Sequence, residues 1–307
     1  MLNGGNGLGQ VVAHWAVNHS LDVARRFGVA ATTVRRSNHL GALGYFTRQA
    51  AEQGMMAFLT QNTRNNMAPA GGRHAGVGNN PFSIAVPSTT AHPVVLDCAC
   101  SAVARSHIDV AAEHGAPIPV GWALDRDGLP TTDASEALLG ALLPFAGHKG
   151  SGMAVMMGAL AGVLSGAKFG SAVPPQSDYG QERDLGHFLF LVDVGQMMDP
   201  GEMSSRMSKY ISEIRSVAPT PGVDAVMVPG ERAHYERLKA HALGVSPDRC
   251  AGLTARDRCR SQSFGTGDRA DEITTRRRFI SGTPVPFLLA GEAGHWAAVP
   301  TAVTPLI

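Results

Sequence analysis

The sequence predicts a layered α/β domain, because helical and strand-like patterns alternate along its first 60 residues. Apolar residues recur at helical spacing from Val11 and stop at Gly28, and a β-branched run follows at residues 29–34. Helical spacing returns over residues 40–53, and residues 55–59 are again strand-like. This alternation is typical of helices packed on a sheet.

The same criteria predict further elements along the chain. Apolar runs bounded by Pro or Gly predict strands at residues 83–86, 94–96, 188–192 and 225–228. Helical spacing predicts helices at residues 108–113, 202–217 and 233–242. The uncharged segment 150–167 approaches the length of a membrane span, but no second such segment occurs, so a buried core helix is favoured.

The composition indicates a globular protein that acts on small molecules. The 307 residues are 44% hydrophobic, and 26 basic against 25 acidic residues give a net charge of +1. Such a balance creates no field for nucleic acid or an anionic membrane. The four cysteines lack a paired C-x-x-C spacing, which predicts no metal site and no disulfide framework and fits a reducing cytoplasm. The first residues lack the features of a signal peptide.

The composition changes near residue 245, which divides the chain into regions 1–245 and 246–307. The second region is rich in arginine and contains no lysine. We predict a disordered tail there; a nucleic-acid-binding arm is the alternative, but no interleaved aromatic residues accompany the arginines.

Several glycine-rich and acidic motifs are interpreted as turns. The string at residues 4–9, Gly-Gly-Asn-Gly-Leu-Gly, is similar to a dinucleotide fingerprint, but we expect no strand before it, and no acidic ribose partner follows at the required distance. The acidic segments 125–128 and 131–133 lack the glutamate that ends a calcium-binding loop, so plain turns are expected.

His39 and Lys149 are the first candidates for chemistry. Ser37 is a residue type that caps helices, which would place His39 in a first helical turn, where the helix dipole lowers its pKa and allows proton exchange near neutrality. Lys149 lies between Gly147 and Gly150, just before the apolar segment, where it could meet a carboxylate or phosphate. A surface histidine and a solvated lysine are the alternatives.

Arg183 and Asp97 complete this set. The planar guanidinium of Arg183 could clamp a carboxylate, or could pair with Glu182 or Asp184 instead. Asp97 ends a predicted strand, where ribose hydroxyls often bind and where aspartate also forms turns.

Six motifs occur in an order that resembles the malate/L-lactate dehydrogenase family of NAD(P)-dependent oxidoreductases, which includes ureidoglycolate and sulfolactate dehydrogenases. They are Ser37-Asn38-His39-Leu40-Gly41, Gly78-Asn79-Asn80-Pro81, Leu96-Asp97-Cys98-Ala99-Cys100-Ser101, Gly128-Leu129-Pro130-Thr131-Thr132-Asp133, Lys149-Gly150 and Pro229-Gly230-Glu231. The resemblance covers about residues 7–245.

The resemblance implies a non-Rossmann mixed-sheet fold, a homodimer, and a cofactor part at roughly residues 80–230. It implies that His39 exchanges the proton of a 2-hydroxy acid while hydride passes to or from NAD or NADP, and that Thr63 and Arg183 contact the substrate. The cofactor-binding residues that it implies are Asp97, Cys98, Ala99, Lys149, Gly230, Glu231 and Arg232.

The sequence departs from the family pattern at several points. The family carries an N-terminal helical region with a Ser-His-Gly motif and an arginine, ahead of the point that corresponds to Met1. Asn79, Cys98, Cys100 and Ser106 replace the usual Thr, Met, Thr and Gly. Two hypotheses follow: a dehydrogenase of a 2-hydroxy acid such as malate, lactate or ureidoglycolate, or a non-enzymatic homologue that retains a dinucleotide pocket.

Overall fold

The computed structural model describes residues 1–88, 92–175, 178, 180–244, 289–290 and 296–297. The chain forms two units, Met1–Ala251 and Gly252–Ile307. In the second unit, β9 (Leu289–Ala290) and β10 (Trp296–Ala297) pair in antiparallel fashion. Apart from these two strands, the predicted tail lies outside the described residues.

The first unit is built on a six-stranded mixed sheet with the strand order β1-β2-β8-β3-β4-β5. β1 pairs with β2 in parallel, and every other pair in this sheet is antiparallel. The strands are β1 (Leu2–Asn3), β2 (Val29–Ser37), β3 (Met55–Gln61), β4 (Phe82–Val86), β5 (Val94–Cys98) and β8 (Leu185–Asp193). The mixed sheet and five of the six predicted strands are confirmed.

The predicted strand at residues 225–228 is wrong. The segment is an irregular connection that ends in a tight turn, because the Glu231 carboxylate accepts the Val228 amide at 2.7 Å and the Glu231 amide donates back to the Val228 carbonyl. An apolar run alone does not distinguish a strand from a segment held by such a turn.

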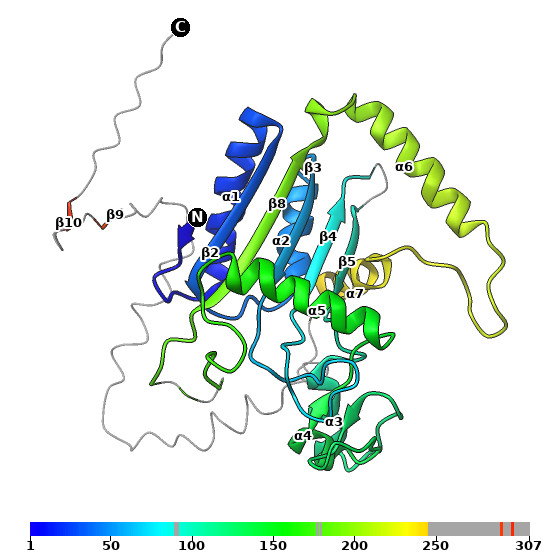
Figure 1. The fold of residues 1–307 in the computed structure, drawn as a ribbon. Helices are drawn as coiled ribbons and strands as arrows, with labels where there is room; N and C mark the ends of the chain where they lie inside the picture. The colour runs from blue at the N-terminus through cyan, green and yellow to red at the C-terminus, as the bar shows by residue number, and fades with distance from the viewer. Residues whose placement is uncertain (89–91, 176–177, 179, 245–288, 291–295, 298–307) are drawn as a thin grey trace, which may run out of the picture. The chain divides into compact units, whose positions relative to one another are not determined.

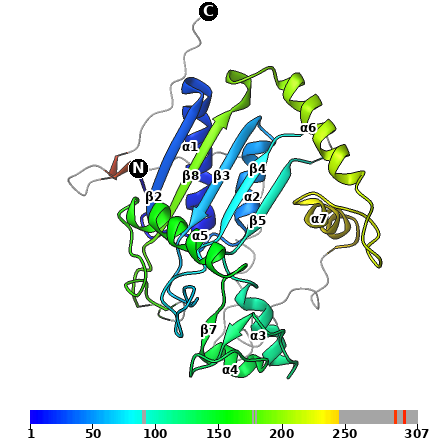
Figure 2. The same ribbon diagram turned by 45° about the vertical axis from the view of Figure 1, so that its right-hand side comes forward.

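Helices cover both faces of the sheet (Figures 1 and 2). α1 (Gly9–Phe27) and α2 (Leu43–Ala51) pack on one face, and α5 (His148–Gly158) crosses the other and continues into the π-helical turn η1 (Ala159–Val163). The remaining elements are α3 (Arg105–Glu113), β6 (Ala123–Leu124), α4 (Ala134–Leu139), β7 (Ala141–Leu142), the 3-10 turn η2 (Val194–Gln196), α6 (Pro200–Arg215) and α7 (Glu231–Leu243).

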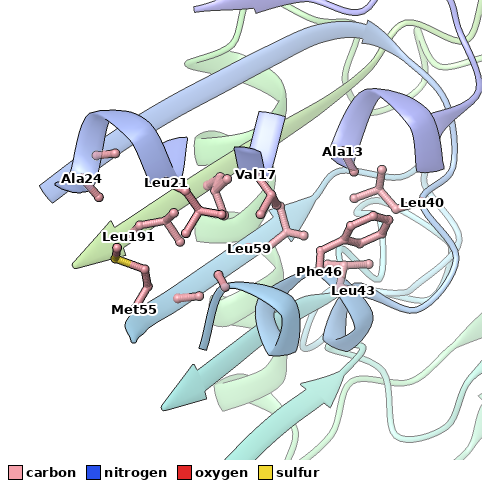
Figure 3. Packing of buried hydrophobic residues seen from close by; sticks show 14 residues of the cluster. Ala13, Val17, Leu21, Ala24, Leu40, Leu43, Phe46, Met55, Leu59 and Leu191 are labelled. Carbon is pink, nitrogen blue, oxygen red and sulfur yellow. The ribbon is translucent and has the colours of Figure 1, made fainter. Parts of the chain in front are cut away.

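The main core lies between the sheet and the pair α1 and α2 (Figure 3). Val17 and Leu21 of α1 meet Leu59 of β3 and Leu191 of β8, and each of these side chains is at most 2% exposed. Their spacing explains the helical pattern of α1 and the alternating pattern of the strands. Residues three to four apart in a helix, and two apart in a strand, face the same side. The core therefore holds β8 and β3 to the helices that flank the His39 segment.

α2 begins later than the sequence suggests, which corrects the position of His39. β2 continues to Ser37 because Ser37 pairs with Leu185 of β8, and the N-cap of α2 is Ala42. His39 therefore lies in a loop between β2 and α2, and Ser37 does not cap a helix.

Residues 150–163 of the uncharged segment lie in α5 and η1, and this helix is buried along one face only. Ala154 and Met157 are buried, whereas Val155 and Met156 are more than half exposed. Among the described residues, no helix is long and apolar enough to cross a membrane.

Candidate functional site

The glycine-rich turn before α1 holds the His39 loop in place. The Asn38 side-chain amide donates to the Gly7 carbonyl at 2.9 Å and to the Asn6 carbonyl at 3.1 Å. A Cβ atom at Gly9 would overlap the carbonyl oxygens of Asn38 and His39, so only glycine permits this close approach. The turn thus positions the backbone on either side of His39.

The turn is not arranged to hold a phosphate. A short strand, β1, does precede it, contrary to expectation. However, the amides of Gly4 and Asn6 donate to carbonyls of β2 at 2.8 and 2.7 Å, and those of Gly5 and Gly7 bond within the turn. Since a dinucleotide fingerprint needs free amides, this arrangement supports the turn interpretation.

Burial and the charge of Arg183 lower the pKa of His39 below its ordinary value of about 6.5. The residue is exposed at one side, so a ligand can reach the imidazole. The pKa of His39 is therefore lowered, as the sequence predicts, but the causes are desolvation and a neighbouring cation rather than a helix N-terminus. His39 is neutral near pH 7 and can accept a proton.

Arg183 is free to bind an anion because its acidic neighbours are engaged elsewhere. Arg36 forms a two-pronged ion pair with Glu182, at 2.8 and 3.2 Å, and its backbone amide donates to the Asp184 carboxylate at 2.6 Å. In the described part of the chain, no hydrogen bond or ion pair reaches the Arg183 guanidinium, and its Nε is buried. The alternative of a surface pair with Glu182 or Asp184 is therefore wrong.

Thr63 lies in a network of asparagines rather than in hydrogen-bond contact with His39 or Arg183 in the described structure. Its hydroxyl donates to Asn79 Oδ1 at 3.0 Å, and its amide donates to Asn80 Oδ1 at 2.8 Å. The Asn80 side chain in turn donates to the Ala154 carbonyl of α5 at 2.7 Å. Asn79, one of the departures from the family pattern, thus orients the Thr63 side chain.

A cavity of about 410 Å³ gathers three of the predicted cofactor residues, Asp97, Gly230 and Arg232. It lies among α2, β5 and the start of α7, and its size is that of a small-molecule site. Sequence reasoning missed its other basic lining residues, which are Arg48, His92, His234 and Arg237. The arginines of this lining suit the phosphates of a dinucleotide, whereas burial and the neighbouring cations lower the pKa of His234.

The polar groups at the cavity are held by the backbone around them. The Gly44 amide donates to the Asp97 carboxylate at 2.7 Å. Burial raises the pKa of Asp97 more than this hydrogen bond lowers it. Gly230 has φ 94°, and a Cβ there would lie 3.0 Å from the Val95 carbonyl oxygen, so glycine is required. Glu231 is buried and closes the turn before α7, with Arg215 as a second partner, so its carboxylate is not available to a ligand.

The remaining predicted cofactor residues do not line this cavity. Cys98 packs against a second hydrophobic cluster, and burial raises the pKa of its thiol. Ala99 follows it at the end of β5. Lys149 is exposed within the first turn of α5 rather than before the helix.

The acidic segments form turns and a cap. The Asp125 carboxylate accepts the amides of Asp127 and Leu129, both at 2.9 Å. Asp133 caps α4 by accepting the amides of Ser135 and Glu136.

Comparison with known proteins identifies the family. The sequence profile of the malate/L-lactate dehydrogenases matches residues 1–250. This chain belongs to the malate/L-lactate dehydrogenase family. It is therefore a member of an oxidoreductase family that includes dehydrogenases of small hydroxy acids.

Relatives with known activities are similar over most of the chain. The L-sulfolactate dehydrogenase of Methanothermobacter thermautotrophicus is 36% identical over 81% of this chain and 71% of its own length. The solved structure of the sulfolactate dehydrogenase from Methanocaldococcus jannaschii superposes with a TM-score of 0.75 at 31% identity, over 85% of this chain and 75% of that one. A Δ1-pyrroline-2-carboxylate/Δ1-piperideine-2-carboxylate reductase of Pseudomonas aeruginosa is 44% identical over 52% of this chain and 48% of its own length.

Replacing Gly9 with alanine tests the close contact between α1 and the His39 loop. We expect Gly9→Ala to displace the loop, lowering turnover by about 100-fold, the scale of a misplacement of about 1 Å, while the dinucleotide still binds. Gly152→Ala is the matched control, since a Cβ there meets no neighbouring atom. Equal turnover in the two variants, measured with a 2-oxo acid and NAD(P)H, would show that the close approach does not position His39.

Proposed function

We propose that this chain transfers a hydride between a nicotinamide cofactor, NAD or NADP, and a small 2-hydroxy acid of the malate, lactate or ureidoglycolate type. The observation that carries the proposal is the unpaired guanidinium of Arg183, whose charge acts on the neutral imidazole of His39. A cation for the substrate carboxylate thus lies close to a base for its hydroxyl.

The roles of the two residues follow from their protonation. In the oxidising direction, Arg183 binds the carboxylate and orients C2, and His39 accepts the hydroxyl proton as the carbonyl forms. The bound nicotinamide supplies the hydride acceptor. In the reducing direction, protonated His39 returns the proton to the carbonyl oxygen. Thr63 would complete the substrate site.

The basic cavity supports a dinucleotide of either type. Asp97 would meet ribose hydroxyls, and the arginines around it would meet phosphates. We assign Gly230 and Arg232 to this site, whereas Cys98, Ala99, Lys149 and Glu231 do not line it and remain cofactor contacts only by the family resemblance. The family resemblance also supports a homodimer, and the free cysteines Cys98 and Cys100 fit a cytoplasmic location.

Removal of the imidazole tests the function. We expect His39→Ala to lower the rate of NAD(P)H oxidation with a 2-oxo acid by about 100- to 10,000-fold. Because the pKa of His39 is lowered, kcat/KM for hydroxy-acid oxidation in the wild type should rise with pH through a midpoint below about 6.5 and then level off. Equal rates in both proteins would remove His39 from the mechanism, and dinucleotide binding without turnover would favour the non-enzymatic homologue.

Removal of the guanidinium tests the carboxylate anchor. We expect Arg183→Gln to raise KM for the 2-oxo acid by about 10- to 100-fold, because a charged hydrogen bond is lost. The acid-limb pKa should also move upward, since the Arg183 charge lowers the pKa of His39. Arg35→Gln, at an exposed arginine of β2, is the control and should change neither quantity. An unchanged KM in Arg183→Gln would place the carboxylate elsewhere.

The reductase from Pseudomonas aeruginosa favours a second candidate substrate class, the cyclic 2-imino acids. These compounds also carry a carboxylate beside the carbon that accepts hydride, so Arg183 could serve both classes. A panel of 2-oxo acids and cyclic 2-imino acids, assayed with NADH and NADPH, separates them by kcat/KM. We expect 2-oxo acids to be preferred; a preference for the imines would replace the hydroxy-acid assignment.

A further inference from the structure

The cavity among α2, β5 and α7 carries more positive than negative side chains. Among the described residues that line it, three arginines, Arg48, Arg232 and Arg237, meet a single carboxylate, that of Asp97. A cleft lined mainly by one sign of charge concentrates ligands of the opposite sign. The partners of each arginine indicate which part of a dinucleotide these charges are placed to bind.

Arg48 already has an acidic partner. Its guanidinium forms an ion pair with Glu52, one turn further along α2, at 2.5 Å, and lies 5.7 Å from the centre of the Tyr45 ring. The Asp97 carboxylate is bonded one turn earlier on the same helix, at the Gly44 amide. The charge of Arg48 is therefore balanced without a ligand, and Asp97 is held toward the start of α2.

The two arginines of α7 have no acidic partner in the described part of the chain. No described ion pair reaches Arg232, and the Arg237 guanidinium donates to His234 Nδ1 at 3.3 Å. His234 in turn stacks on His92, with ring centres 4.2 Å apart. Burial and the neighbouring cations lower the pKa of His234, so this ring is neutral near pH 7. It thus positions Arg237 without compensating its charge.

The backbone at the start of α7 can bind other phosphates. Gly230, Arg232 and Ala233 line the cavity, and α7 begins without a side-chain cap. The amide of His234 donates to the Gly230 carbonyl at 2.9 Å, so the amides of Arg232 and Ala233 precede the first bond of the helix. Such amides have no partner within the helix and bind phosphate readily. A pyrophosphate can use them, which leaves the two guanidinium groups for a further phosphate.

We propose that Arg232 and Arg237 bind the 2′-phosphate of NADP(H), and that this chain uses NADP(H) in preference to NAD(H). This inference rests on the proposed dehydrogenase function and names its cofactor. A phosphate monoester carries a charge of about −1.5 to −2 near pH 7, which two guanidinium groups match. NAD(H) has a hydroxyl at that position and would leave both charges uncompensated. Asp97 meets a ribose hydroxyl that the two cofactors share.

Titration calorimetry of the cofactor-free protein tests the site without requiring turnover. The probes are adenosine 2′,5′-bisphosphate and adenosine 5′-monophosphate, which differ only in the 2′-phosphate. We expect the bisphosphate to bind the wild type more tightly. Arg232→Gln and Arg237→Gln should each weaken its binding by about 10- to 100-fold, because a charged hydrogen bond is lost, and should leave the affinity for the monophosphate unchanged.

Binding of the complete cofactors gives a second readout, from the fluorescence of the reduced nicotinamide. In the wild type we expect a lower Kd for NADPH than for NADH. Arg232→Gln and Arg237→Gln should raise the Kd of NADPH toward that of NADH and leave the Kd of NADH unchanged. Lys239→Gln is the matched control, since it removes a positive charge from the same helix at a residue that pairs with Glu236 and does not line the cavity. It should change neither Kd.

Several results would overturn the assignment. A wild type that binds NADH as tightly as NADPH, or more tightly, contradicts it without any variant. An equal loss of affinity for NADPH and NADH in Arg232→Gln and Arg237→Gln would assign these arginines to the pyrophosphate, and the same loss in Lys239→Gln would reduce their effect to net charge. Turnover with NADH alone would refute this inference and leave the proposed function standing. Selective NADPH binding without turnover would count against the proposed function and not against the phosphate site.

Discussion

The site depends on the antiparallel placement of β8 between β2 and β3. The Ser37–Leu185 pair fixes where β2 ends and the His39 loop begins, and the next pairs along β8 place Gln61, whose side chain accepts the Leu40 amide of that loop. Because strand side chains alternate between faces, a slip of one residue would turn Gln61 away from the loop and remove Leu189 and Leu191 from the core. Packing and site geometry therefore rest on the same register.

An irregularity in this pairing shapes the charge distribution. The register of β2 and β8 shifts between Val34 and Ser37, and Arg36 and Asp184 both adopt positive φ angles, of 52° and 48°. Such backbone is unfavourable for residues with a side chain and persists where the surroundings hold it. Here the bonds from Arg36 to Glu182 and Asp184 hold it, and the same bonds leave Arg183 without an acidic partner. The bulge thus engages Arg36 in structural bonds and leaves Arg183 available for the proposed contact with substrate.

Much of the fold could be predicted from local patterns, and the errors have identifiable causes. Helical and strand periodicity placed α1, α2 and β3 close to their observed positions. Ser37 looked like a helix cap because its pairing with Leu185, almost 150 residues away, is not visible locally. Arg48 and Arg237 were missed because they lie almost 190 residues apart in the chain and line one cavity only in the folded protein.

The sequence by itself determined most helices and strands of the main sheet, the family and the identity of His39 as the candidate base, because these depend on residues close together in the chain. Only the tertiary structure decided that Arg183 is unpaired, that Glu231 closes a turn, and that arginines and histidines from α2, β5 and α7 line one cavity. Ion pairing and desolvation depend on which distant segments meet. The spacing of residues within one segment does not reveal which segments these are.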